Sequence, residues 1–161
     1  MRLLSNYPDC LVCGQKNSAS LKTKFYIEGD KVIAFCTPQA CHAGYKGITH
    51  GGLLGSILDE ALGRIVSNTT KKFVVTGTLE IKYKKSVPIE TPLRIEAWMN
   101  AEQKRPRFYW EATGEIWNEE KTILYTTATG KFFKVPENKY SEILSSIELE
   151  GCPRSVTIED L

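Results

Sequence analysis

The stretch His50-Gly51-Gly52-Leu53-Leu54-Gly55-Ser56-Ile57-Leu58-Asp59-Glu60-Ala61-Leu62-Gly63 predicts the centre of the fold. Its apolar residues recur at helical spacing, and we expect an α-helix from about Gly51 to Ser67. Glycines at a helix start leave backbone N–H groups uncovered, which suits an anion or a polarised carbonyl oxygen. One acid, Asp59, follows within the apolar stripe. An acid in such a place needs a partner or a chemical role, so this helix is the candidate functional element.

Composition limits the class of protein. The chain has 161 residues, of which 42% are hydrophobic and 25% charged, enough for one globular domain with a substantial core. A formal net charge of +2 is too small to indicate nucleic acid as the main partner. The sequence has no apolar run near the roughly 20 residues of a membrane span. It also has no signal-peptide pattern, so we expect a cytoplasmic protein without a membrane partner.

The cysteines favour reduced thiols over a disulfide framework. There are five of them, at positions 10, 13, 36, 41 and 152, an odd number without a secretion signal. The segment Cys10-Leu11-Val12-Cys13-Gly14 is a CxxC turn, which holds zinc where two more ligands converge. Cys36, Cys41 and His42 are the candidates for those ligands. Because a second CxxC pair is missing, we expect no metal.

The residues around the helix are typical of antiparallel strands. Runs with β-branched or alternating character predict a hairpin at 21–27 and 31–36, and later strands at 73–83, 93–99, 108–117 and 121–135. An irregular lead-in (1–20), one domain (21–136) and a tail with a short helix (137–161) complete the predicted organisation. A helix this apolar must be covered by the sheet. The prediction is an α+β fold in which a curved antiparallel sheet wraps one long central helix.

On these residues the sequence resembles the hotdog-fold acyl-CoA thioesterases, specifically the PaaI-like group. The resemblance rests on His50-Gly51-Gly52 followed by Asp59, nine residues after the histidine. The strand 74–83, the segment 88–97 and the CxxCG lead-in support it, and it covers about residues 8–135. It implies a hotdog fold and hydrolysis of an acyl-CoA to a free acid and coenzyme A. It also implies no separate cofactor, and a homodimer or a dimer of dimers.

The spacing of Gly52 and Asp59 independently points to a dimer. Seven residues separate them, so they share a helix face but lie ~10 Å apart along the axis. An oxyanion-hole donor lies ~3 Å from the oxygen it stabilises, and the base lies equally near the reacting carbon. One chain does not meet both requirements. Two chains related by a two-fold axis do, with Gly52 from one and Asp59 from the other.

Each candidate catalytic residue has a chemical and a structural interpretation. Asp59 attacks the thioester or activates a water, and the sequence does not distinguish the two; the alternative is an ion pair with Arg64. The Gly52 N–H, assisted by the helix dipole, is the oxyanion-hole candidate, or else part of a tight turn. His50, at the helix cap, is expected to fix the loop or contact substrate, and the alternative is that it acts as a base. By resemblance, Thr76 orients the carboxylate or water, although threonine also simply favours strands.

We expect small residues near Asp59 to form a channel for a thin substrate. Gly51, Gly55 and Ser56 are its candidate lining, with Gly63 on the same face; the alternative is close packing of the helix on a strand. Many relatives have an asparagine six residues before the histidine. This chain has Gly44 there, and nearby His42 is the candidate replacement.

Basic side chains near the strand ends are candidates for binding the phosphates of coenzyme A. We single out Lys84 and Lys85, together with Lys82, Lys104, Arg105 and Arg107. For each of them a solvated surface position is an equal alternative.

Three other functions compete with hydrolysis. The first is a non-catalytic acyl-CoA-binding sensor on the same fold; regulators of that type carry a DNA-binding helix-turn-helix, and we find no such segment. The second is a hotdog dehydratase or hydratase, which uses a different histidine–acid pattern. The third is a zinc-stabilised scaffold built on the CxxC turn. The acyl chain length, and whether the acyl group is aromatic, stay open.

Overall fold

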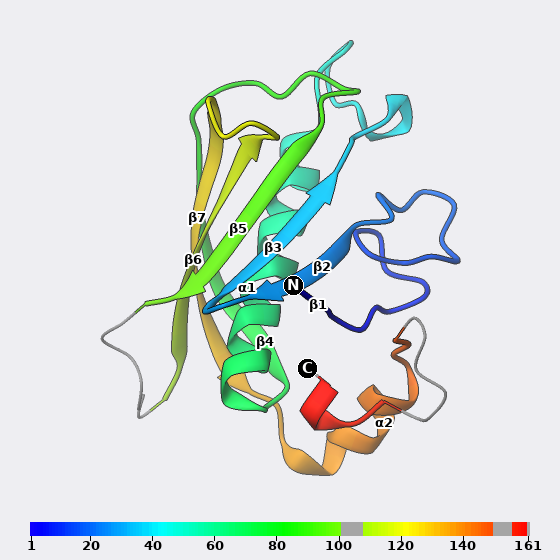
Figure 1. Ribbon diagram of the computed structural model, residues 1–161, viewed down its shortest axis with the longest axis vertical. Helices are drawn as coiled ribbons and strands as arrows, with labels where there is room; N and C mark the ends of the chain where they lie inside the picture. The colour runs from blue at the N-terminus through cyan, green and yellow to red at the C-terminus, as the bar shows by residue number, and fades with distance from the viewer. Residues whose placement is uncertain (101–107, 150–155, 161) are drawn as a thin grey trace.

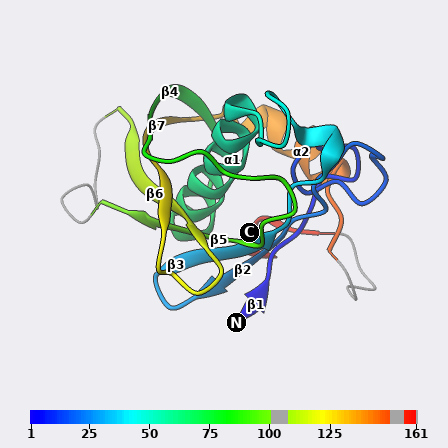
Figure 2. The same cartoon turned by 90° about the horizontal axis from the view of Figure 1, so that it is seen from above.

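The computed structural model describes residues 1–100, 108–149 and 156–160. Helix α1 (Gly51–Thr70) lies against one curved antiparallel sheet (Figures 1 and 2). Within the described residues the sheet has seven strands in the order β1-β2-β3-β5-β6-β7-β4. The strands are β1 (Arg2–Leu3), β2 (Lys24–Glu28), β3 (Lys31–Cys36), β4 (Val74–Tyr83), β5 (Leu93–Met99), β6 (Trp110–Asn118) and β7 (Leu124–Lys134). The expected helix wrapped by an antiparallel sheet is confirmed.

Shorter elements flank this core. They are the 3-10 helices η1 (Ala40–His42), η3 (Glu137–Lys139) and η4 (Ile158–Asp160), and the helix α2 (Tyr140–Ser145). The backbone of Asn6 bonds that of Glu148 in both directions, at 2.6 and 2.8 Å, and so ties the tail to the N-terminal segment. Across the described ranges, no helix is long and apolar enough to cross a membrane. Cys152 lies outside these ranges.

Helix α1 has defined signals at both ends. At its start, the His50 side chain caps the helix by accepting a hydrogen bond from the Gly52 N–H at 2.9 Å. At its end, Lys71 adopts a left-handed conformation with φ 53°, and its N–H bonds the carbonyl of Ser67. The helix therefore ends three residues beyond the expected Ser67, because Asn68, Thr69 and Thr70 stay helical.

The apolar face of α1 forms the core with the inner face of the sheet. Ile57, Leu58 and Leu62 are fully buried, and each such side chain stabilises the fold by about 1.5–3 kcal/mol. Gly114 on β6 permits this close approach, because a Cβ there would lie 3.2 Å from Leu58 Cδ2. The core therefore fixes the position of α1, and with it the position of Asp59.

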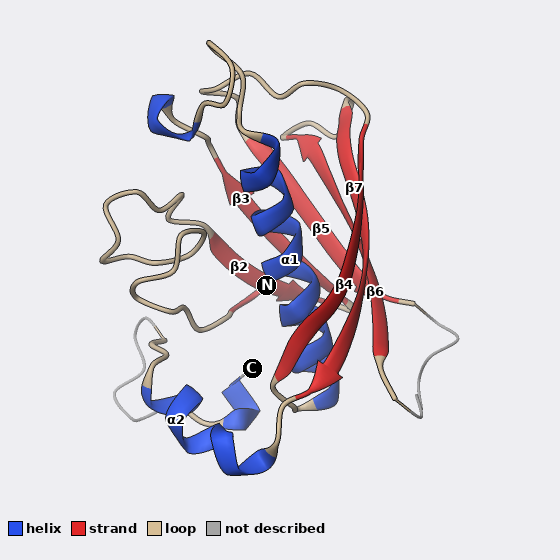
Figure 3. Cartoon of the chain, turned by 180° about the vertical axis from the view of Figure 1, so that it is seen from behind, coloured by secondary structure: helices blue, strands red, loops and turns tan. Residues whose placement is uncertain are grey.

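Strand β4 is an open edge of the sheet beside α1 (Figure 3). It pairs with β7 from Val74 to Tyr83, and in the described structure no strand pairs with its other side. Val75 and Tyr83 are 55% and 54% exposed. A bulge between Thr76 and Thr78 interrupts its register. A long edge strand with exposed apolar side chains is a ready template for pairing with another chain.

The outer face of the sheet contains a buried carboxylate, Glu96 on β5, which is 3% exposed. It accepts bonds from Lys121 Nζ and Arg94 Nε, both at 2.8 Å, and from Lys31 Nζ at 3.1 Å. Burial alone would raise the pKa of Glu96, but these three cations outweigh it and lower the pKa from 4.5 to about 2. The cluster therefore ties β3 and the β6–β7 turn to the middle of β5.

Candidate active site

Asp59 is held by a threonine on the neighbouring strand. Thr76, at the bulge of β4, donates its hydroxyl to Asp59 Oδ1 at 2.6 Å. Gly77 makes this local geometry possible, because a Cβ there would lie 2.2 Å from the Phe133 ring. Hydroxyl-to-carboxylate bonds of this length are charge-assisted and orient the acceptor. The bond occupies one carboxylate oxygen of Asp59.

Asp59 faces a cavity of about 190 Å³ between α1 and β4. The lining combines polar groups with aromatic rings, a mixture common in substrate pockets. It consists of Leu4, Ser5, Tyr7, Asp59, Glu60, Gly63, Arg64, Ser67, Phe73, Val74, Thr76 and Phe132. Gly63, one of the small residues expected near Asp59, therefore lines its cavity.

The expected alternative, an ion pair between Asp59 and Arg64, is wrong. Arg64 instead binds Glu60, with Nε and Nη2 at 3.0 and 2.6 Å from Oε1, and its Nη1 donates to the Ser5 carbonyl at 2.6 Å. Burial would lower the pKa of Arg64, but the Glu60 carboxylate outweighs it, so the pKa is raised and the guanidinium stays charged. Arg64 is therefore committed to Glu60, and Asp59 is left with Thr76.

The candidate oxyanion hole lies at the other end of the helix face. The Gly52 N–H already donates to His50 Nδ1 at 2.9 Å, so it binds a carbonyl only when the imidazole turns away. Within the described part of the chain the Gly51 N–H has no acceptor. The Gly51 carbonyl accepts a hydrogen bond from the Tyr83 hydroxyl at 2.9 Å, a contact that no local sequence pattern predicts. The structure therefore offers two adjacent N–H groups, one open and one capped.

A second cavity, of about 370 Å³, adjoins this helix start. Its lining consists of Leu11, Ala19, Cys41, His42, Ala43, His50, Gly52, Leu53 and Ser56. Among the described residues it shares no lining residue with the Asp59 cavity. One chain therefore keeps Gly52 and His50 apart from Asp59 and Thr76. Gly51 lines a third, open hollow with Gly44 and Tyr45.

His42 does not offer a free nitrogen. Its Nδ1 accepts the Gln39 N–H at 2.9 Å, and its Nε2 lies 2.9 Å from the Ala19 carbonyl. His42 therefore lines the second cavity, but neither of its ring nitrogens is available for the role of the missing asparagine. Gly44 packs under His50, because a Cβ there would lie 3.1 Å from the His50 Cα. A side chain at this position would require His50 to shift by a few tenths of an ångström.

The small residues of the helix face divide between the two ends. Ser56 lines the second cavity, and its hydroxyl donates to the Gly52 carbonyl at 3.0 Å. Gly55 lies against β4, because a Cβ there would come within 2.9 Å of Ile81 Cδ1. Its observed environment is therefore the close helix–strand contact.

Lys84 and Lys85 are exposed just beyond the end of β4. They follow Tyr83, whose hydroxyl contacts Gly51, and so lie at the N-terminal end of α1. Lys82 pairs with Glu80 at 3.2 Å on the exposed strand. The other expected basic residues, Lys104, Arg105 and Arg107, lie outside the described residues.

Comparison with known proteins finds similarity to thioesterases over the middle of the chain. Residues 46–124 match the thioesterase superfamily. The acyl-coenzyme A thioesterase THEM4 of Bos taurus is 33% identical over 98 residues, which are 61% of this chain. The chain spans only 38% of that relative's length.

Solved structures agree on the fold. The Escherichia coli PaaI protein of the phenylacetic acid degradation operon superposes with a TM-score of 0.62 and 17% identity, covering 72% of this chain and 81% of that one. A hypothetical thioesterase protein with coenzyme A from Streptococcus pneumoniae gives 0.61 and 22%, with 70% and 85% covered. The predicted hotdog fold is confirmed, and residues 46–124, which include α1, are similar to the thioesterase superfamily.

Proposed function

We propose that the chain is an acyl-CoA thioester hydrolase whose catalytic carboxylate is Asp59. The observation that carries this proposal is the 2.6 Å bond from Thr76 to Asp59. This bond orients toward a cavity an acid for which the described residues supply no cationic partner. The similarity to THEM4 and to a coenzyme A-bound thioesterase supports acyl-CoA as the substrate. The free state of the four described cysteines is consistent with a reducing compartment such as the cytoplasm.

We further propose that two copies complete each site. Asp59 and Gly52 line separate cavities, and Thr76 lies on β4, the strand at the open edge of the sheet. Pairing of two β4 edges would cover Val75 and bring the Gly51–Gly52 end of one copy toward Asp59 of the other. The assembly is then at least a dimer, and face-to-face association of two such dimers would give a dimer of dimers.

In the assembled site, the second oxygen of Asp59 takes a proton from water, and the resulting hydroxide attacks the thioester carbonyl carbon. The Gly51 N–H, joined by that of Gly52 when His50 turns away, stabilises the negative oxygen. The C–S bond then breaks, and coenzyme A leaves as a thiolate that takes up the proton. In the alternative route Asp59 itself attacks, and water hydrolyses the resulting anhydride. The exposed Lys84 and Lys85 are our proposed ligands for the phosphates of coenzyme A.

Release of coenzyme A thiol from short, medium, long and aromatic acyl-CoAs tests the proposal. We expect wild-type turnover of at least one of them, and a loss of about 100- to 10,000-fold in kcat for Asp59→Asn with acyl-CoA binding retained. Tight binding without release from any substrate would contradict hydrolysis and favour a sensor on the same fold.

A further inference from the structure

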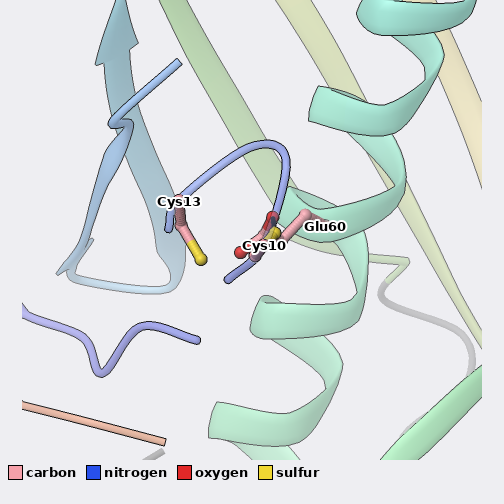
Figure 4. A group of neighbouring side chains, drawn as sticks. All are labelled: Cys10, Cys13 and Glu60. Carbon is pink, nitrogen blue, oxygen red and sulfur yellow. Dashed lines mark hydrogen bonds between the residues drawn. The ribbon is translucent and has the colours of Figure 1, made fainter. Parts of the chain in front are cut away.

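The CxxC turn of the N-terminal segment meets helix α1 one residue after Asp59. The sulfur atoms of Cys10 and Cys13 and a carboxylate oxygen of Glu60 all lie within 4.8 Å of one another. Figure 4 shows these three side chains pointing toward a common space between the turn and the helix. Neither the proposed hydrolysis nor the resemblance gives this cluster a role.

We propose that Cys10, Cys13 and Glu60 bind one thiophilic divalent cation, with zinc as the biological ion. Two thiolates and one carboxylate supply three ligands of a tetrahedral site, and a water supplies the fourth. Thiolate ligands favour zinc over magnesium or calcium, which prefer all-oxygen sites. The metal would join the N-terminal segment to α1.

The backbone of the turn is arranged to support thiolates. The Val12 N–H donates to Cys10 Sγ at 3.2 Å, and the Tyr7 N–H donates to Cys13 Sγ at 3.4 Å. Gly14 closes the turn with an N–H bond to the Cys10 carbonyl at 3.0 Å. A Cβ on Gly14 would lie 2.4 Å from that same oxygen, so only glycine fits. Both sulfur atoms are therefore held in place by main-chain donors.

Glu60 presents one oxygen to the sulfur atoms. Arg64 occupies Oε1 with two bonds, whereas Oε2 lies 3.2 Å from Cys10 Sγ. Arg64 Nη2 also lies 3.3 Å from Cys13 Sγ. Oε2 accepts a hydrogen bond from the Cys10 thiol, whose proton a metal ion would replace. An outer cation that fixes the other oxygen of such a carboxylate is the usual second layer of a metal site.

The charges of the cluster favour a divalent ion. Two thiolates and the Glu60 carboxylate carry three negative charges, and Arg64 carries one positive charge. A cation of charge +2 makes the sum zero, which a largely buried cluster requires. Cys13 is fully buried, and the Glu60 and Arg64 side chains are 15% and 10% exposed.

The third ligand is not one of those expected from the sequence. Both nitrogens of His42 are engaged elsewhere. Cys36 is buried on β3, where burial raises the pKa of its thiol to about 12. Cys41 is exposed beside the second cavity. No spacing in the sequence links Glu60 to the CxxC turn, so its approach to the turn is a product of the fold.

Cobalt(II) titration of the reduced, metal-free full chain tests the site. We expect one equivalent to bind, with thiolate-to-cobalt charge-transfer absorption and the strong visible bands of four-coordinate cobalt, and zinc to displace it. Cys10→Ser and Cys13→Ser should each weaken the charge-transfer band. Glu60→Gln should keep it while weakening zinc binding by about tenfold or more. Cys41→Ser is the matched control and should match wild type.

A labelling experiment avoids dependence on variant folding. In the folded wild-type chain, one equivalent of zinc should protect Cys10 from iodoacetamide and leave the exposed Cys41 fully reactive, as read by peptide mass spectrometry. Sub-stoichiometric binding of both metals, or binding that survives both serine variants, would overturn the proposal. A Cys10–Cys13 disulfide that forms in a chain unable to bind metal would also overturn it. None of these readouts measures hydrolysis, so failure here is distinct from failure of the proposed function.

Discussion

Replacing Thr76 with valine removes one hydroxyl from the proposed active site and keeps the shape and strand preference of the residue. The lost bond joins Thr76 Oγ1 to Asp59 Oδ1 at 2.6 Å. A hydrogen bond to a charged group contributes about 1.5–3 kcal/mol. If the orientation that this bond imposes is worth that much in the transition state and little in the ground state, its loss lowers kcat by about 10- to 150-fold. The Asp59 carboxylate stays in place but loses its fixed orientation.

The assay is thiol release from the best acyl-CoA substrate, with kcat and KM measured separately. Thr76→Ser restores the hydroxyl and should return the rate to within a few-fold of wild type. Thr78→Val alters an exposed threonine two residues along the same strand and should leave kcat unchanged. Wild-type turnover by Thr76→Val, or a serine variant as slow as the valine variant, would refute the role of the Thr76 hydroxyl.

Two further predictions concern stability. Glu96→Gln leaves three cations around a neutral group, and the pKa difference from 4.5 to about 2 corresponds to about 3 kcal/mol of unfolding free energy at pH 7. Because the pKa of Glu96 is lower in the folded state, this contribution is present above pH 4.5 and disappears as the pH falls toward 2. In urea denaturation, the difference in unfolding free energy between wild type and Glu96→Gln should therefore be large at pH 7 and small at pH 3. Equal differences at the two pH values would contradict this prediction. Gly14→Ala places a Cβ against the Cys10 carbonyl and should lower the unfolding free energy by about 1–3 kcal/mol and abolish cobalt binding. An alanine variant with wild-type stability and a full cobalt spectrum would refute this account of the turn.

Periodicity was sufficient to predict the elements of the core. The apolar spacing of α1 and the alternation in β5, β6 and β7 reflect burial of these elements against one another, so the pattern appears in the sequence itself. Strand β1, of two residues, is too short to show a period. The observed end of α1 also differs from the predicted one, because the helix ends where Lys71 adopts a left-handed conformation that no sequence pattern indicates.

Parts of the site depend on contacts between distant residues. The approach of Thr76 to Asp59 came only from family resemblance, because nothing local in either segment indicates the other. Glu60 and Arg64 have the four-residue spacing of a helical ion pair, and this spacing is the sequence signal that favours Glu60 over Asp59 as the partner of Arg64. The turn that brings Cys10 to Glu60 joins residues 50 positions apart, and no spacing rule predicts such a contact.

The central claim is that each active site takes Asp59 from one copy and the Gly51–Gly52 helix start from the other. Asp59→Asn and Gly52→Val chains, carrying different affinity tags and co-expressed, yield a heterodimer that tandem purification isolates. One of its two sites then contains both substitutions and the other contains neither. We predict that this heterodimer hydrolyses acyl-CoA at about half the wild-type rate per dimer, although both parent homodimers are inactive. A heterodimer as inactive as its parents would contradict the shared site.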